Sequence, residues 1–170
     1  SADSGSINLH GNSISLLSIG VGFQKKLTGY ENIFLSGLLL GYTKEQVEEK
    51  INDIIEFSEL GDFIYKPVSS YSSGMYSKLA FSITAILETD IMLIDEVLSV
   101  GDIHFREKSY NKMKELINDS DRTVVIVSHS TKTIVELCDK VIWLHDGLIK
   151  DEGEPALIMA KYEEYMRSLN

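Results

Sequence analysis

Two short apolar runs, each ending in polar and chemically active residues, constrain the fold of this chain more than any other feature. Residues 91–96 read Ile-Met-Leu-Ile-Asp-Glu, and residues 123–129 read Thr-Val-Val-Ile-Val-Ser-His. Continuous apolar runs of this length are typical of parallel strands that are buried on both faces. Parallel strands need long crossover connections, and a helical pattern separates the two runs. The sequence therefore predicts an α/β fold with a mainly parallel sheet.

Local signals place the other elements along the chain. Thr28 and Thr43 each stand three residues before a Glu or Gln, which forms a capping box that opens a helix. Asp146-Gly147 is typical of a hairpin turn, and Glu154-Pro155 of a helix start. The expected elements are strands at 7–9 and 13–19 around a turn at 11–12, helices at 28–40, 43–60 and 75–87, a strand at 91–94, a helix at 103–117, a strand at 123–127, a helix at 131–138, strands at 140–144 and 148–150, and a terminal helix from 155.

Ligands of open parallel sheets bind at the carboxyl ends of the strands, and Asp95, Glu96 and His129 all lie at such ends. Neighbouring strand residues face opposite ways, so the two acids are expected to have different roles. One can hold Mg²⁺ through water and the other can orient an attacking water molecule. The alternative is a pair of solvated acids that begin a loop. His129 can donate to a phosphate that gains charge, or it can cap the next helix or stand exposed.

Ser72, Ser73 and Gly74 lead directly into a predicted helix. The free N–H groups and partial positive charge at a helix start can hold an anion, and glycine lets a phosphate approach the backbone closely. The simpler interpretation is a helix cap by one of the two serines, and both interpretations can hold together.

Composition and charge narrow the classes of function. The chain has 170 residues, enough for one domain, and its formal net charge of −10 argues against a nucleic-acid partner. Cys138 is the single cysteine and is interpreted as a structural thiol in a reducing compartment. His10, His104 and His145 are interpreted as structural, and no spacing of His and Cys predicts a zinc site. No apolar run has membrane-spanning length.

The sequence has no Gly-Lys pair and hence no phosphate loop of the G-x-x-x-x-G-K-[S/T] form. It has no G-x-G-x-x-G and no G-x-S-x-G nucleophile turn either. Hydrolases of the latter type are therefore unsupported, and any nucleotide bound here needs its phosphates held by other residues.

The order and spacing of these elements resemble the ATP-binding domain of ABC transporters, from its Q-loop to its C-terminus and over nearly the whole chain. The resemblance implies a P-loop NTPase-like fold in which a helical subdomain covers about residues 28–88. It implies Mg²⁺ and nucleotide sensing by Gln24, a nucleotide-contacting signature motif at Ser72, Ser73 and Gly74, water-mediated Mg²⁺ binding by Asp95, catalysis by Glu96 and His129, and a D-loop at Ser99, Gly101 and Asp102.

Three stretches, 27–33, 71–75 and 96–102, resemble the ABC branch that exports cell-surface polysaccharides and teichoic acids. Met75 replaces the signature glutamine, so no polar contact is expected there. The branch implies ATP and Mg²⁺ as cofactors, a homodimer of ATP-binding domains and a transmembrane permease as partners, and a peripheral place on the cytoplasmic face of the membrane. Phe34, Leu38 and Tyr42 are candidate permease contacts, although core packing is the expected role of each one.

In that family the phosphate loop, an adenine-stacking aromatic residue and the first core strand precede the region that the chain resembles. We therefore expect the chain alone not to hydrolyse ATP, and expect an unpaired strand edge that favours association between copies. Two alternatives stay open: a non-transport ABC ATPase that acts on DNA or ribosomes, and a non-catalytic module that docks onto a partner. The acidic charge and the exporter-like stretches disfavour the first.

Overall fold

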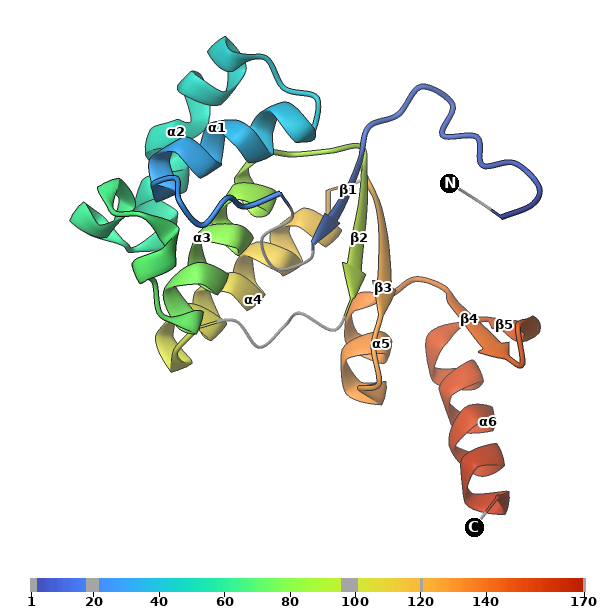
Figure 1. Ribbon diagram of the computed structural model, residues 1–170. Coiled ribbons are helices and arrows are strands. Elements are labelled where there is room, and N and C mark those ends of the chain that lie inside the picture. The colour runs from blue at the N-terminus through green and yellow to red at the C-terminus, as the bar shows by residue number, and fades with distance from the viewer. Residues whose placement is uncertain (1–2, 18–21, 96–100, 120, 170) are drawn as a thin grey trace. The chain divides into compact units, whose positions relative to one another are not determined.

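The computed structural model describes residues 3–17, 22–95, 101–119 and 121–169 (Figure 1). The chain packs as two units, Ser1–Val125 and Ile126–Asn170. In chain order the elements are β1 (Ile14–Leu17), α1 (Gly29–Leu39), α2 (Lys44–Ser58), the 3₁₀ turns η1 (Gly61–Tyr65) and η2 (Val68–Ser70), α3 (Ser73–Ile86), β2 (Ile91–Asp95), α4 (Ile103–Ile117), β3 (Thr123–Val127), α5 (Thr131–Leu137), β4 (Val141–His145), β5 (Leu148–Gly153) and α6 (Pro155–Ser168).

The main sheet has the strand order β1-β2-β3. β1 runs parallel to β2, with Ile14 opposite Ile91 and Leu17 opposite Ile94. The crossover between these two strands carries α1, α2 and α3, as Figure 1 shows. The predicted α/β class and the parallel pairing are thus confirmed. Within the described sheet, β1 and β3 are the two edge strands and β2 is paired on both sides, and the unpaired edge expected from a missing strand stays a prediction.

The predicted strand at residues 7–9 is wrong, whereas the turn that follows it is confirmed. His10 and Gly11 take φ values of 51° and 82°, and the Asn12 N–H donates to the Leu9 carbonyl at 2.9 Å. The chain then pairs with a distant segment, because the N–H of Ser13 donates to the Asp90 carboxylate at 2.7 Å. The alternating pattern at residues 7–9 is compatible with a local hairpin. In the structure, β1 pairs with β2 instead.

The predicted burial on both faces is wrong for the two apolar runs, because in β2 only alternate residues are buried and in β3 Val125 and Val127 are 47% and 61% exposed. Met92 and Ile94 are each 1% exposed, while Ile14 and Leu16 on the neighbouring strand are 40% and 47% exposed. The register places Ile14 beside Ile91 and Leu16 beside Leu93, so these four side chains share one face. The described helices therefore cover one face of β1 and β2 and leave the other open.

The helices between β1 and β2 enclose their own apolar core. Thr28 and Thr43 form the predicted capping boxes of α1 and α2, which confirms both helix starts. Leu38 is 54% exposed, while Phe34 and Tyr42 pack partly against the core. The buried core side chains are Ile33, Val47, Ile51, Ile54, Leu60, Ile64, Leu79, Ile83 and Leu87.

The second unit is built on a hairpin and one helix. β4 and β5 pair antiparallel, and the positive φ values of Asp146 (49°) and Gly147 (77°) are those of a type I′ turn, as predicted. Glu154 caps α6 by accepting from two backbone N–H groups, and Pro155 occupies its first turn. Trp143 of β4 packs edge-on against two tyrosines of α6, at ring distances of 5.4 and 5.3 Å.

Candidate functional site

The predicted signature residues lie at the start of α3. The Ser72 hydroxyl accepts from the Met75 N–H at 3.2 Å, so Ser72 is the helix cap. Ser72 and Ser73 are exposed, and a Cβ built on Gly74 would meet only the Ser72 hydroxyl at 3.9 Å. The helix start is therefore both capped and open to approach from outside, which leaves its first N–H groups available to an anion.

Tyr71 ties the beginning of this motif to the helical core. Its hydroxyl donates to the Phe63 carbonyl at 2.7 Å. The same hydroxyl occupies the space that a Cβ on Gly29 would need, so glycine is required at the first position of α1. Burial raises the pKa of the Tyr71 hydroxyl, which remains a donor at neutral pH. The motif is thus anchored to α1 and η1 by a residue to which sequence reasoning assigned no separate role.

Gln24 lies on the segment between β1 and α1, and its side chain is exposed. Its backbone is bound by Asn32 of α1, a fully buried residue that sequence reasoning missed. The one signal that points to Asn32 is an amide side chain in the first turns of a largely apolar helix. On the other side of the segment, the Phe23 ring packs edge-on against Tyr76 of α3 at 5.0 Å.

An ion-pair network joins the predicted D-loop to α3. The Lys78 ammonium lies 2.8 Å from the Asp102 carboxylate and 3.4 Å from that of Glu59. Lys108 lies 3.0 Å from Glu59 and donates to the Phe57 carbonyl at 3.0 Å. The Lys78 side chain is 15% exposed while that of Asp102 is 60% exposed, so their ion pair is shielded from water on the lysine side only.

Asp102 has two tasks in this network. Besides binding Lys78, it caps α4 by accepting from the Phe105 N–H at 3.0 Å. The hydrogen bond from Lys78, and then the one from Phe105, lower the pKa of Asp102 from 3.8 to about 2. For Glu59, burial acts to raise the pKa, but the hydrogen bonds and charges of Lys108 and Lys78 lower it overall. The carboxylates are therefore held ionised, and the turn at Asp102 is fixed to α3.

The pKa of Asp102 predicts a pH dependence of stability. Because this pKa falls from 3.8 to about 2 on folding, ionised Asp102 stabilises the fold above pH 3.8, and the effect disappears as pH falls through about 2. We expect Asp102→Asn to lower the urea midpoint at about pH 6, and the difference to shrink towards about pH 2. Asp53→Asn, at an exposed position of α2, is the control. Equal midpoints for Asp102→Asn and the unsubstituted chain at neutral pH would contradict this prediction.

Of the remaining predicted site residues, Asp95 is exposed at the end of β2. Glu96 and Ser99 lie outside the described residues. His129 follows β3 in the second unit and is exposed, and the cap of α5 is Ser130, whose hydroxyl accepts from the Thr133 N–H at 3.2 Å. The alternative role of His129 as a helix cap is therefore excluded, while its role towards phosphate stays a prediction.

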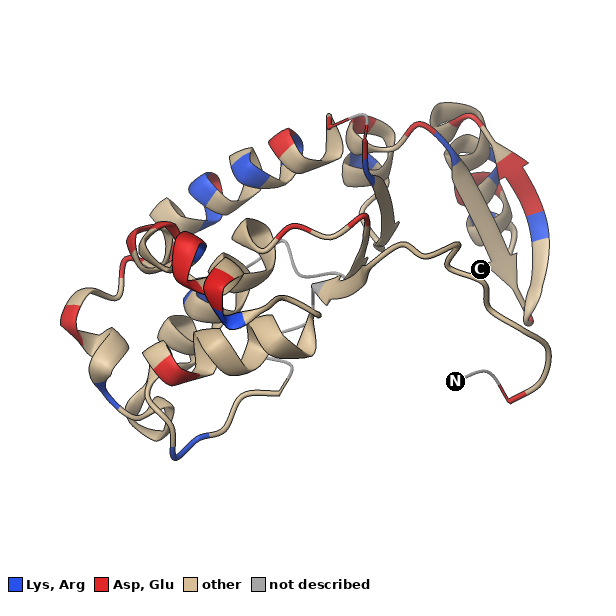
Figure 2. Ribbon diagram, turned by 90° about the horizontal axis from the view of Figure 1, so that it is seen from above, with Lys and Arg blue, Asp and Glu red and all other residues tan. Residues whose placement is uncertain are grey.

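The described residues contain no group of three or more His, Cys, Asp or Glu side chains that could hold a metal ion. If Asp95 and Gln24 hold Mg²⁺ as the sequence predicts, they would supply one carboxylate and one amide, and phosphate oxygens and water would have to complete the coordination. Among the same residues, no helix is both long and apolar enough to cross a bilayer. Acidic and basic residues are mixed over the ribbon (Figure 2), with 26 Asp and Glu against 16 Lys and Arg in the sequence.

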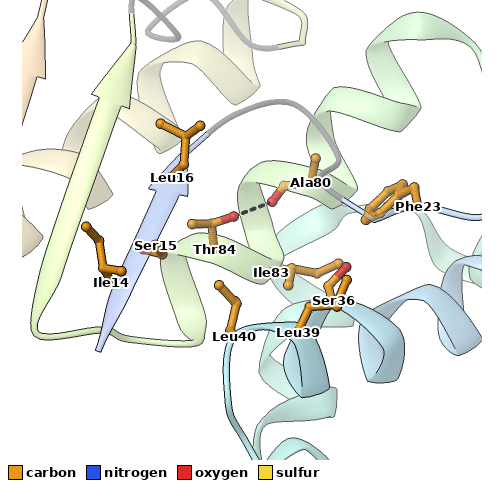
Figure 3. Close-up of a pocket in the computed structure, with 10 residues that line it drawn as sticks. All are labelled: Ile14, Ser15, Leu16, Phe23, Ser36, Leu39, Leu40, Ala80, Ile83 and Thr84. Carbon is orange, nitrogen blue, oxygen red and sulfur yellow. Dashed lines mark hydrogen bonds between the residues drawn. The ribbon is translucent and has the colours of Figure 1, made fainter. Parts of the chain in front are cut away.

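A cavity of about 210 Å³ lies between β1, α1 and α3 (Figure 3). Its polar members are mostly satisfied, since Ser15 pairs with Thr89 at 2.6 Å and Thr84 donates to the Ala80 carbonyl at 3.1 Å. Most of its other lining residues are apolar, so it offers no phosphate or metal ligands. The lining residues are Ile14, Ser15, Leu16, Phe23, Ser36, Leu39, Leu40, Ala80, Ile83 and Thr84.

No protein-family model matches the chain, but named relatives do. It is 46% identical over 163 residues to the teichoic acids export ATP-binding protein TagH of Lactococcus lactis, covering 96% of the chain and 34% of the relative. It is 43% identical over 163 residues to TagH of Levilactobacillus brevis, covering 96% and 45%. It is 41% identical to the O-antigen export system ATP-binding protein RfbB of Klebsiella pneumoniae, covering 95% and 65%. The chain thus spans less than two thirds of these relatives.

Two solved structures share the fold. One is an ATP-binding subunit of an ABC transporter, with a TM-score of 0.72, 19% identity and coverage of 89% of this chain and 62% of that one. The other is a dimeric ATP-binding cassette in a post-hydrolysis state bound to ADP and phosphate, with a TM-score of 0.65, 21% identity and coverage of 85% and 63%. The chain therefore has the fold of these two proteins, which confirms the predicted P-loop NTPase-like fold.

Proposed function

We propose that this chain, which is homologous over most of its length to ABC ATP-binding proteins of teichoic acid and O-antigen export, is part of an ATP-hydrolysing subunit that powers export of a cell-surface polysaccharide. The observation that carries the proposal is that the predicted signature motif lies directly beside the predicted D-loop. The exposed start of α3 and the turn at Asp102 are tied together by Lys78. A helix start with free N–H groups, together with a second loop fixed beside it, suits contact with the phosphates of one nucleotide.

In the proposed reaction, each predicted residue acts on the terminal phosphate or on the attacking water. The start of α3 donates backbone N–H groups to a phosphate that the phosphate loop of a second domain holds. Glu96 orients and polarises the water, and His129 donates to the phosphate as it gains charge. Asp95 and Gln24 would hold Mg²⁺ through water, and the ion neutralises phosphate charge when it is bound with ATP.

The proposed partners are a second ATP-binding domain and a membrane-spanning permease. One solved structure of this fold is a dimer, which supports the first. The helices between β1 and β2 expose large apolar side chains, namely Leu38 (54%), Leu39 (61%), Phe63 (52%) and Tyr65 (63%), which supports the second. Docking there would hold the protein peripherally at the cytoplasmic face of the membrane.

Binding of ATP tests this function directly. We expect the natural gene product that contains this sequence to bind a fluorescent ATP analogue in the presence of Mg²⁺. We expect the 170-residue chain alone to bind it weakly or not at all, because the sequence has no Gly-Lys phosphate loop. A gene product that binds no nucleotide, yet binds a membrane protein in pull-down, would instead support a non-catalytic docking module.

A further inference from the structure

We propose that Asn32 is a positioning residue that sets the place of Gln24 in the nucleotide site. The inference rests on the proposed function, because it assumes that Gln24 contacts nucleotide or Mg²⁺. Asn32 itself is 0% exposed, so a ligand in solution cannot contact it directly. Its effect on the reaction would therefore pass through the Gln24 backbone.

The side-chain amide of Asn32 engages both polar groups of the Gln24 backbone. Its Oδ1 accepts from the Gln24 N–H at 2.7 Å, and its Nδ2 donates to the Gln24 carbonyl at 3.1 Å. Nδ2 also donates to the carbonyls of Thr28 at 2.8 Å and Leu27 at 3.3 Å. Such a paired contact resembles one rung of a strand ladder, and it fixes the peptide groups on either side of Gln24.

Burial makes these contacts difficult to replace. Burial of an amide without hydrogen-bond partners is unfavourable, so a residue whose only role is core packing would be apolar. The side-chain amide of Asn32 instead forms hydrogen bonds with the backbone of the segment from Gln24 to Thr28. The Gln24 side chain is left exposed, so its backbone is held while its amide stays available to a ligand.

Packing on either side of Gln24 limits the movement of the same segment. Leu39 of α1 occupies the space that a Cβ on Gly22 would need, and Gly22 has a φ of 80°. The Phe23 ring contacts Tyr76, which lies one turn into the helix that starts at the signature motif. The segment around Gln24 is therefore held between α1 and α3. The hydrogen bonds from Asn32 fix the orientation of the Gln24 backbone within it.

The geometry is tested on the 170-residue chain itself by hydrogen exchange. We expect Asn32→Ala to accelerate exchange of the Gln24 amide strongly, because the Asn32 Oδ1 is the acceptor of that amide. Asn32→Leu keeps about the size of the side chain and also removes the acceptor of that amide, so it serves where the alanine variant is poorly folded. Unchanged Gln24 exchange in a folded variant would overturn the inference without touching the proposed function.

The role in the reaction is tested by a double-mutant cycle in the natural gene product. We expect Asn32→Asp to lower kcat/KM for Mg-ATP about tenfold, and to have no further effect in a Gln24→Ala background. Ser58→Ala is the matched control, since Ser58 is also 0% exposed and the change removes side-chain hydrogen bonds to the backbone, one to the Ile55 carbonyl and one from the Leu60 N–H. It should leave kcat/KM unchanged.

Two results would overturn the inference. One is an equal loss of kcat/KM in both backgrounds, which would mean that Asn32 acts on the fold as a whole. The other is no loss from Asn32→Asp. A gene product without ATPase activity before any substitution would overturn the proposed function, and this inference with it, even where the exchange experiment succeeds.

Discussion

Replacement of Phe105 by alanine is expected to lower the free energy of unfolding by about 3–5 kcal/mol. Phe105 is 0% exposed in α4 and packs against Phe57 of α2 at 5.8 Å and Phe81 of α3 at 6.1 Å. The Lys78 ammonium lies 5.1 Å from its ring centre. Alanine would therefore leave a cavity where three helices meet and would also loosen the ion pairs that fix the D-loop turn.

Urea unfolding of the purified chain measures this effect. The matched control is Ile103→Ala, two residues earlier in the same helix, because Ile103 is 83% exposed. The control should change the free energy by less than about 0.5 kcal/mol. Similar losses for the two variants would mean that α4 does not pack against α2 and α3 as described.

Replacement of Glu96 by glutamine is expected to lower the ATPase kcat of the natural gene product by about 10²- to 10⁴-fold. The expected cause is loss of the carboxylate that polarises the attacking water, while glutamine keeps the size of the side chain. Because the change removes a group that acts in the transition state, KM for Mg-ATP should change little. Steady-state phosphate release at saturating Mg-ATP is the measurement.

Glu107→Gln, at an exposed position of α4, controls for a general effect of one lost negative charge. It should leave kcat unchanged. A Glu96→Gln variant that retained most of its activity would show that another residue orients the water. The assignment of Glu96 rests on its place after the apolar run, since Glu96 lies outside the described residues.

Local sequence signals predicted most elements well. The bounds of α4 and β3 match the predicted ranges, and both threonine capping boxes are present. These signals act over about four residues, through caps, turns and helical periodicity, so they need no knowledge of the rest of the fold. The wrong strand at residues 7–9 shows the limit, because its alternating pattern says nothing about which segment supplies a partner for β1.

The sequence likewise predicted only some residues of the candidate site and missed their partners. Sequence reasoning identified Ser72 as a possible cap and Asp102 as part of a loop, but not the lysine that joins them. It named Gln24 but missed Asn32, which binds the Gln24 backbone. A polar residue whose partners lie outside its own turn carries no periodic signal, so its role becomes visible only when the elements are packed.

The sequence by itself determined the order of strands and helices, their caps and turns, and the polar residues at the strand ends, since each depends on neighbouring residues. The tertiary structure alone decided the partner of β1, the open face at Ile14 and Leu16, and the ion pairs that hold Asp102 to α3. These features join residues far apart in the chain, as in the contact between Lys108 and Glu59 over 49 positions. They arise because burial and charge pairing depend on which surfaces meet, and no local pattern encodes that.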